Sequence, residues 1–490
     1  MDAGEKLKQD VRDGRIDMDR MIDVIVTLQR QLEAAKQRIA ELEKNAGGST
    51  PVTSKVDASF SMREEEKRQK KRGKTKPKLS KKARLGRVTS ADKLKLAERT
   101  EQCFPEGLSA KECQLSHRRP VWRLENGRAI LIAYEIYRGP KNQYGKIPGV
   151  LGRSEFGMEI VVEIAYFVYA MGLSFDKVCL TLQFLQNLKL SKTQADRLLR
   201  QLSRHWQSEF DVLCTLLANS LVVHADETSW SLKSAWALLS ERSRLLIFGC
   251  RKDADTLECL LPKATFHGVL CSDDAAIYRG FTNAQKCWAH LLRKAIKFTL
   301  LEPENATYRR VLDELLAIYR AAKSHSINTA LTAAERTEHV DKLTHQLCQL
   351  LGEFVIDEPP PPVGTTARDF HNLMHEFTRL SLENELFTFV QHPAATGTNN
   401  EAERTLRSPA QDRKTGRTSK TPSGAKRRSI LVSVLESVKL HLPKFTLATL
   451  LAEVTRWHDT GQSLFEGLLK KPETARPGPS ILEKLSPKPG

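Results

Sequence analysis

The sequence predicts an α/β fold in which a mixed sheet is flanked by helices and interrupted by a helical insertion. Three short apolar runs of strand type follow one another from residue 218, in the segments SLVVHAD, SAWALLSE and SRLLIFGC. A helical segment comes next, and GVLCSD and the residues around AQKCWAH predict a fourth and a fifth strand. A helical pattern then runs from Leu291 to about Glu385, before the next helix expected of the core begins near Asn399.

The bulk composition indicates a protein that meets an anionic polymer. The chain has 77 Lys and Arg against 59 Asp and Glu, a net charge of +18, which attracts nucleic acid. No apolar run reaches the roughly 20 residues that span a bilayer. The N-terminus has no signal-peptide pattern, so we expect a cytoplasmic protein. The nine cysteines are spread singly, as in a reduced protein.

The N-terminal part predicts self-association followed by a basic linker. Apolar residues from Met18 to Leu42 recur in steps of three and four, which is typical of a coiled coil and hence of a homo-oligomer. The alternative is one amphipathic helix packed on its own chain. The linker has 12 Lys or Arg among the 21 residues from Lys67 to Arg87, and can neutralise several phosphates. Its expected DNA contacts include Lys70, Lys71 and Arg72.

Two amphipathic runs joined at residues 187–190 outline a helix-turn-helix. Ser191 and Gln194 form a capping box at the start of the second run. That second helix would present polar and basic side chains to a major groove, although two packed helices also occur without any role in DNA binding. The expected contacts are Lys192, Thr193, Gln194, Arg197 and Arg200.

These patterns divide the chain into eight parts. Cys103, Cys113 and His117 offer three zinc ligands, but their spacing matches no standard finger, which favours ordinary packing. The expected parts are a coiled coil at 1–45, a disordered basic linker at 46–100, a small irregular region resembling a degenerate zinc finger at 101–153, a helical DNA-binding region at 154–217, the first part of the core at 218–298, a helical insertion at 299–397, the second part of the core with C-terminal helices at 398–470, and a disordered tail at 471–490.

Three carboxylates occupy positions that suit a metal site acting on phosphate. Asp226 and Asp273 each close a strand-type run, and Glu403 lies early in a predicted helix rich in arginine. Two divalent ions held by such a cluster can activate a nucleophile and stabilise a leaving oxyanion in phosphodiester cleavage. Mg²⁺ prefers carboxylate oxygens, and Mn²⁺ can replace it. We therefore expect a two-metal site.

Each carboxylate also has a structural interpretation. Asp273 or Asp274 could cap a helix that starts at Ala275. Glu401 could form a capping box with Thr398, which leaves Glu403 as the carboxylate without a local role. A zinc site is a further alternative, although the apolar residues before CWAH better fit a buried junction between a strand and a helix. Its ligands would be His224, Cys287 and His290.

Amide and guanidinium groups flank Glu403. Arg407 is four residues further on, and so lies on the same face of the predicted helix. Such donors suit phosphate oxygens, and basic residues continue downstream. The expected DNA contacts are Arg404, Arg407, Arg413 and Lys414, and the auxiliary candidates are His290, Asn400 and Asp274.

The motifs HADETSW, SDDAAIY, CWAHLLRK and TNNEAERTLR, followed by GAKRR, resemble those of the DDE transposases of the insertion sequence 66 family. The resemblance covers roughly residues 10–460. It implies an RNase H-like core, two Mg²⁺ ions, cleavage at element ends and transfer of the 3′-hydroxyl into target DNA. It also implies that Asp226, Asp273 and Glu403 are the catalytic metal ligands, with Asp273 preferred to Asp274 because the family pattern reads S-D-x-x-x-x-Y.

The same resemblance implies double-stranded DNA as the partner, both as the terminal inverted repeats of an element and as target, together with accessory proteins of that element. Family members commonly carry paired cysteines before the core, whereas residues 101–153 of this chain hold only the widely spaced Cys103 and Cys113. Two other functions remain open. The protein could be a DNA-binding protein derived from a transposase, or a stand-alone RNase H-like nuclease.

Overall fold

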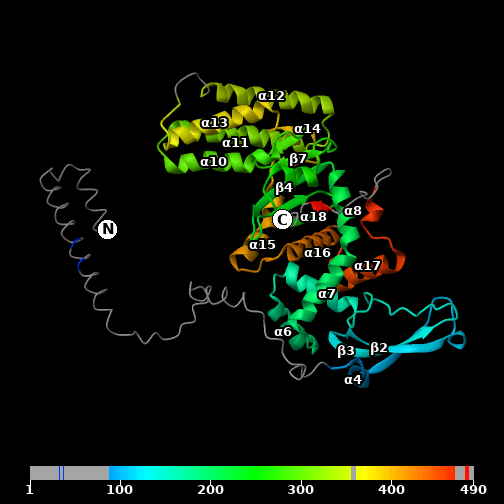
Figure 1. Cartoon of the computed structure of the whole chain (residues 1–490). Helices are drawn as coiled ribbons and strands as arrows, with labels where there is room; N and C mark the ends of the chain where they lie inside the picture. The colour runs from blue at the N-terminus through cyan, green and yellow to red at the C-terminus, as the bar shows by residue number, and fades with distance from the viewer. Residues whose placement is uncertain (1–32, 34–36, 38–87, 355–359, 470–480, 485–490) are drawn as a thin grey trace. The chain divides into compact units, whose positions relative to one another are not determined.

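The computed structural model describes residues 88–354, 360–469 and 481–484. Of the first 87 residues, a separate unit, it describes only Glu33 and Gln37, both helical and exposed (Figure 1). The predicted coiled coil and the basic residues Lys70, Lys71 and Arg72 lie outside the described residues. Within the described part, no helix has the length and apolar character needed to cross a bilayer.

A three-stranded sheet occupies the region expected to be irregular. Its strand order is β1-β3-β2, with β1 parallel and β2 antiparallel to β3. The turn between β2 and β3 is Asn126-Gly127, and both residues have positive φ, as a two-residue hairpin turn requires. The expectations of an irregular region at 101–153, and of a disordered linker as far as residue 100, were therefore wrong. The elements are α4 (Ser90–Lys95), β1 (Arg99–Cys103), η2 (Ala110–Glu112), β2 (Gln114–Glu125) and β3 (Arg128–Arg138).

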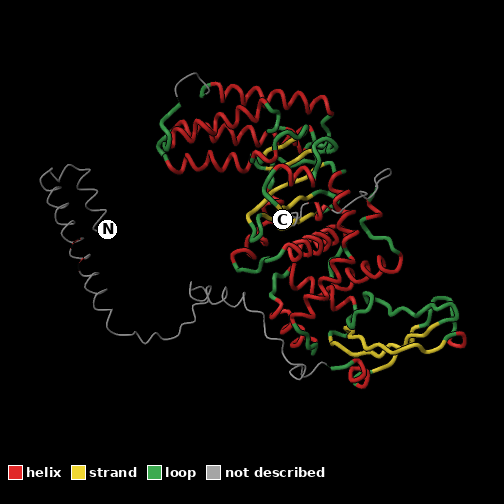
Figure 2. Tube along the Cα trace, in the orientation of Figure 1, coloured by secondary structure: helices red, strands yellow, loops and turns green. Residues whose placement is uncertain are grey.

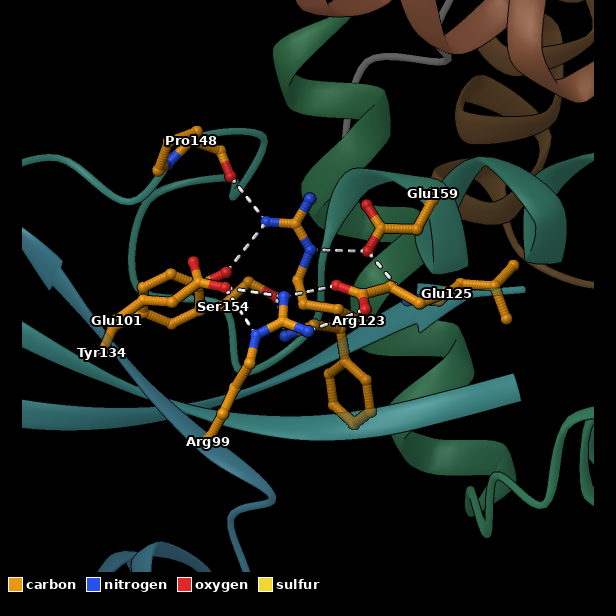
Figure 3. Close-up of polar contacts among 10 residues, drawn as sticks. Arg99, Glu101, Arg123, Glu125, Tyr134, Pro148, Ser154 and Glu159 are labelled. Atoms are coloured by element: carbon orange, nitrogen blue, oxygen red, sulfur yellow. Dashed lines mark hydrogen bonds and ion pairs between the residues drawn. The ribbon is translucent and has the colours of Figure 1, made fainter. Parts of the chain in front are cut away.

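A partly buried ion pair joins this small sheet to the following helix, α5 (Met158–Ala165). Arg123 of β2 donates through Nε to Glu159 Oε1 at 2.7 Å, and its Nη1 donates to the carbonyl of Pro148 at 2.8 Å (Figure 3). Glu159 also accepts from the backbone N–H of Leu124. Because both charges have further hydrogen-bond partners, the pair fixes the position of the sheet against α5.

The helical region expected at 154–217 is confirmed as helical. Asn187 ends α6 in the left-handed conformation. The predicted capping box of Ser191 and Gln194 is present at the start of α7. The buried face of α7 includes Leu198 and Leu202, which leaves its polar side chains outward. The elements are α5, the π-helical turn η3 (Tyr166–Ala170), α6 (Phe175–Gln186), α7 (Lys192–His205) and α8 (Gln207–Ala218).

The predicted mixed sheet is confirmed, with strand order β6-β5-β4-β7-β8. Figure 2 shows strands in yellow and helices in red. Strands β4, β5 and β6 are antiparallel neighbours, whereas β4, β7 and β8 run parallel. The fifth strand is shorter than expected, since CWAH does not extend it and Trp288 instead begins a helix. The elements are β4 (Val222–Ser229), β5 (Ser234–Leu239), β6 (Arg244–Cys250), α9 (Ala254–Leu260), β7 (Val269–Ser272), η4 (Ala276–Tyr278) and β8 (Ala284–Lys286).

Helices after the insertion complete the core. In α15, Ala402 and Leu406 pack against Ala237 and Leu239 of β5. The tail expected to be disordered at 471–490 contains a short helix, α18, because its Ile481 and Leu482 are buried in the main core. The elements are α15 (Asn400–Lys414), α16 (Pro422–His441), α17 (Leu447–Thr460), η5 (Glu466–Leu468) and α18 (Ile481–Lys484).

Helix α16 runs along the edge strand β6 and bonds to its backbone through three serines. The hydroxyls of Ser429, Ser433 and Ser437 accept hydrogen bonds from the N–H groups of residues 248, 246 and 244, at 2.9–3.0 Å. Four helical residues advance about 6 Å and two strand residues about 7 Å, so the spacings match. We call this set, Ser429, Ser433 and Ser437, the serine ladder.

The predicted insertion is a helical bundle with its own aromatic core. Trp288 is fully buried and contacts the rings of Tyr319, Phe377 and Phe387. The bundle begins earlier than the expected residue 299, because α10 starts directly after β8. Its helices are α10 (Trp288–Leu301), α11 (Ala306–Ile327), α12 (Ala333–Gly352), α13 (Thr366–Leu382) and α14 (Thr388–Gln391).

Candidate functional site

Two of the predicted carboxylates belong to adjacent parallel strands. The register of β4 and β7 pairs His224 with Cys271. Asp226 and Asp273 each come two residues later, and alternate residues of a strand share a face. Parallel pairing therefore places Asp226, within β4, on the same side of the sheet as Asp273, which directly follows β7.

The third predicted carboxylate comes from the first turn of α15. Asp226 pairs with Ala237 across β4 and β5, and Ala237 packs against α15, so Asp226 faces this helix. Asn399, just before α15, donates through Nδ2 to the carbonyl of Ala225 at 2.8 Å. These contacts fix the start of α15, and with it Glu403, above the end of β4.

The carboxylates act on one another electrostatically. The pKa of Asp226 is raised to about 7, first by burial and then by the negative charges of Glu227, Asp273 and Glu403. Like charges raise a carboxyl pKa because they oppose ionisation, and a bound cation would remove that opposition. The three residues predicted from the sequence thus belong to one electrostatic cluster.

Neighbouring acidic residues are occupied by other partners. Glu227 is buried, accepts from the hydroxyl of Tyr278, and lies 2.5 Å from Lys252 Nζ. Asp274 pairs with Arg379 of α13. Asp273 accepts from the backbone N–H of Ala275 at 3.0 Å. This contact closes a turn rather than capping the expected helix, because only the 3-10 turn η4 follows.

The capping box predicted for Thr398 and Glu401 is not formed. Asn399 is the N-cap residue of α15, and no side chain caps the helix. Glu401 pairs instead with Arg244 of β6. The prediction was wrong because the contact of Asn399 with Ala225 draws the start of the helix onto the sheet.

A second group of potential ligands overlaps the carboxylate cluster. Ligand atoms of Cys287, His290 and Glu403 lie within 4.8 Å of one another. Among the described residues, this is the group in which three or more His, Cys, Asp or Glu side chains lie close enough to hold a metal ion. His224 is not part of it. The predicted alternative of His224, Cys287 and His290 is therefore not assembled, although two of its members are. Cys103, Cys113 and His117 also lie outside the group.

A pocket of about 400 Å³ opens beside Asp273, between the sheet and the helical bundle. Lys286, at the end of β8, contributes a side chain that is only 1% exposed. Its Nζ lies 3.4 Å from Ser272 Oγ and 3.6 Å from Glu385, and burial lowers its pKa. The lining residues are Asp273, Asp274, Ala275, Lys286, Cys287, His290, Leu291, Lys294 and Glu376.

The sequence did not predict the cationic side chains that lie at the site. Arg293 donates to both oxygens of Glu403 at 3.2 Å, and Arg379 and Lys286 reach the site from the bundle and from β8. The partners of each are distant in the chain. The one local signal is the position of Arg293, three residues after His290 and therefore on the same side of α10.

The predicted DNA contacts of α7 are all exposed. Some already have partners, since Lys192 pairs with Asp176 at 2.9 Å and Arg200 with Asp196 at 2.8 Å. Gln194 serves the capping box. The exposed side chains of this predicted surface are Lys192, Thr193, Gln194, Arg197 and Arg200.

The predicted contacts of α15 differ in exposure. Arg404, Arg407 and Lys414 are exposed, as is Asn400. Arg413 is half-buried and donates to the carbonyl of Ser229 at the end of β4. It therefore holds α15 against the sheet, and is less available than the other three.

Comparison with protein-family models identifies the class of protein, because residues 153–427 match a model of transposases. The match covers more than half of the 490 residues, from the helical region into α16. The model is that of the Transposase IS66 family, and the chain belongs to this family. A search of the curated proteins finds no match.

Proposed function

We propose that the protein is a DNA transposase with an RNase H-like core, which cleaves the ends of its element and joins their 3′-hydroxyls to target DNA. The observation that carries the proposal is that Asp226 lies on the face of β4 that packs against α15, the helix of Glu403, while Asp273 directly follows the adjacent parallel strand. Membership of the transposase family supports it. So does the sheet, in which three antiparallel strands are followed by two parallel ones, as the family resemblance leads us to expect.

The donor set fits divalent metal ions. Asp226 and Asp273 offer carboxylate oxygens from adjacent strands on the same side of the sheet, and Glu403 offers a third carboxylate from α15. Hard cations such as Mg²⁺ prefer such oxygens, and Mn²⁺ can take the place of Mg²⁺. When bound, a pair of such ions would activate the attacking hydroxyl and stabilise the leaving oxyanion. Asp226 must lose its proton before it can act as a ligand.

Cationic groups around the cluster would position the DNA backbone. Lys286 and Lys294 line the pocket beside Asp273. A phosphate in this pocket would give buried Lys286 a further negatively charged partner. Arg404, Arg407 and Lys414 on α15, and the exposed face of α7, would extend the contact along double-stranded DNA. The coiled-coil oligomer, the accessory proteins and the cytoplasmic location remain predictions.

The test is cleavage and joining of DNA that carries the inverted repeats flanking the gene. We expect Asp226→Asn, Asp273→Asn and Glu403→Gln each to lower Mg²⁺-dependent nicking by on the order of a thousandfold, while DNA binding persists. Asp274→Asn and Glu401→Gln are matched controls, because both carboxylates have ion-pair partners outside the cluster. These controls should retain most of the activity.

Two results would point to the other functions. Binding to the repeats without cleavage, under any divalent metal, would indicate a transposase-derived DNA-binding protein. Cleavage without joining of the 3′-hydroxyl to target DNA would indicate a stand-alone nuclease. Full activity of Asp226→Asn would contradict the assignment of the catalytic cluster.

A further inference from the structure

We propose that Cys287, His290 and Glu403 form a binding site for a thiophilic transition-metal ion such as Zn²⁺ or Co²⁺. The inference rests on the proposed function only through Glu403, which would serve both sites. It places a thiolate and an imidazole, which suit transition metals, beside the carboxylates Asp226 and Asp273. The three ligand atoms already lie within 4.8 Å of one another.

The backbone brings these ligands together from three elements. Cys287 is the residue between β8 and α10, at the N-cap position of α10. His290 is three residues later, one helical turn away, and so lies on the same side. Glu403 approaches from α15, whose start is held to Cys287 by the backbone N–H of Asn399, 3.1 Å from Sγ. The cluster therefore depends on the packing of α15 against the first turn of α10.

The histidine nitrogen that faces Glu403 lacks a hydrogen-bond partner. His290 Nδ1 is buried and unbonded, although it lies 3.5 Å from Glu403 Oε1. A buried polar atom left in this way destabilises the fold, and such atoms in native structures call for an explanation. A cation between the ring and the carboxylate would supply the missing partner of Nδ1.

The thiol can become a ligand by losing its proton to solvent as the metal–sulfur bond forms. Burial raises the pKa of Cys287, while the backbone N–H groups of Asn399, His290 and Ala289 act in the opposite direction. A cation at the site would favour the thiolate further. Arg293 donates to both oxygens of Glu403, as the outer partners of metal ligands commonly do.

The pocket gives the site an open side. Cys287 and His290 both line the cavity of about 400 Å³ that also contains Asp273. Three protein ligands with one open position are typical of zinc sites that bind water or substrate, whereas structural zinc sites have four protein ligands. A thiolate and an imidazole also favour Zn²⁺ and Co²⁺ over Mg²⁺. The ion would therefore sit where a phosphate oxygen entering the pocket can reach it.

The test is titration of the full-length reduced protein with Co²⁺, without DNA. We expect a near-ultraviolet absorption band from thiolate-to-cobalt charge transfer, and displacement of the band by Zn²⁺. Cys287→Ala should abolish the band, and His290→Gln should weaken Co²⁺ binding by more than about tenfold. Cys250→Ala is the matched control, since Cys250 is equally buried but lies on β6, and its band should equal that of the wild type.

Metal binding and DNA cleavage can fail independently. Asp226→Asn should keep the charge-transfer band while losing Mg²⁺-dependent nicking. A wild-type protein that nicks DNA but shows no band would overturn the site and leave the proposed function standing. Equal bands in the wild type and in Cys287→Ala would also overturn it. If Cys287→Ala does not fold, as judged by circular dichroism, unchanged affinity of His290→Gln for Co²⁺ would overturn it instead.

Discussion

Asp226 is the carboxyl whose ionisation is opposed by its burial and by the neighbouring carboxylates. Its carboxyl is half-buried within β4, and its pKa of about 7 reflects burial and the charges of Glu227, Asp273 and Glu403. Without a bound cation, much of the population keeps a proton on this carboxyl near neutral pH. Carboxyl pKa values raised in this way are common at functional sites.

Replacing this carboxyl should stabilise the metal-free protein at high pH. The folded-state pKa of about 7 lies above the unfolded value of about 3.9. The carboxyl therefore gives its full stability below about pH 4, and loses it as pH rises through 7. We expect Asp226→Asn to raise the free energy of unfolding by about 1–2 kcal/mol at pH 8, after allowance for solvent screening. Its effect at pH 5 should be much smaller.

Thermal unfolding at pH 5 and pH 8, in chelator, measures this difference. Added Mg²⁺ provides the control, because ligand binding to the folded state should raise the melting temperature of the wild type at pH 8 more than that of the variant. An equal effect of Asp226→Asn at both pH values would argue against the raised pKa.

The sequence located the acidic residues of the site but not their partners. Asp226 and Asp273 could be selected as candidates because each closes an apolar run of strand type, and Glu403 because the neighbouring Glu401 was given a local role as a cap. The contact of Arg293 with Glu403 joins residues from two helices separated by the bundle, and nothing in the local pattern specifies it. The assignment of Glu401 as a cap was wrong because a tertiary contact of Asn399 overrode a local capping preference.

At the scale of elements, the serine ladder couples α16 to β6 through hydrogen bonds from the strand backbone to the serine hydroxyls. Ser433 is fully buried. It accepts from the N–H of Leu246 at 2.9 Å and donates to the carbonyl of the same residue at 3.2 Å. An edge strand exposes such groups to pairing with other chains, and a helix that covers them prevents this.

Removing one hydroxyl of the ladder should therefore be costly. Ser433→Ala leaves the N–H and carbonyl of Leu246 buried without partners, and we expect a loss of about 1–3 kcal/mol in the free energy of unfolding. Ser408→Ala, at an exposed position of α15, is a control that should change stability by less than about 0.5 kcal/mol. Urea denaturation measures both. A loss in Ser433→Ala no larger than that of the control would show that the ladder contributes little.

Elements with a strong local pattern were predictable, and those defined by distant packing were not. The strands β4, β5 and β6 follow from compact apolar runs. The small sheet was missed even though Asn126-Gly127 is a strong hairpin signal. Helix α18 could not be predicted, because the surrounding residues are rich in proline and only burial of Ile481 and Leu482 against the main core supports the helix.

For the whole molecule, the charge of +18 predicts a binding affinity that depends on salt. The triple variant Lys70→Gln, Lys71→Gln, Arg72→Gln should reduce the slope of log affinity against log salt concentration by about 2 to 3, if each side chain neutralises one phosphate. The loss should be similar for any DNA sequence, since phosphate contacts carry no base information.

Fluorescence anisotropy with DNA at several salt concentrations measures the slope. A matched control replaces three cations of the bundle that pair with acidic side chains, Arg309, Arg310 and Lys342. This variant should leave the slope nearly unchanged. An unchanged slope in the linker variant would exclude that tract from contact with DNA.

Helix α10 belongs to two parts of the molecule at once. Its first turn carries Cys287 and His290 at the site, and the rest of its buried face, including Leu291 and Phe298, packs in the aromatic core of the bundle. No loop separates the two, so the bundle cannot tilt without moving the ligands. If the bundle touched DNA, a displacement of the bundle would therefore be transmitted through α10 to Cys287 and His290, beside Glu403.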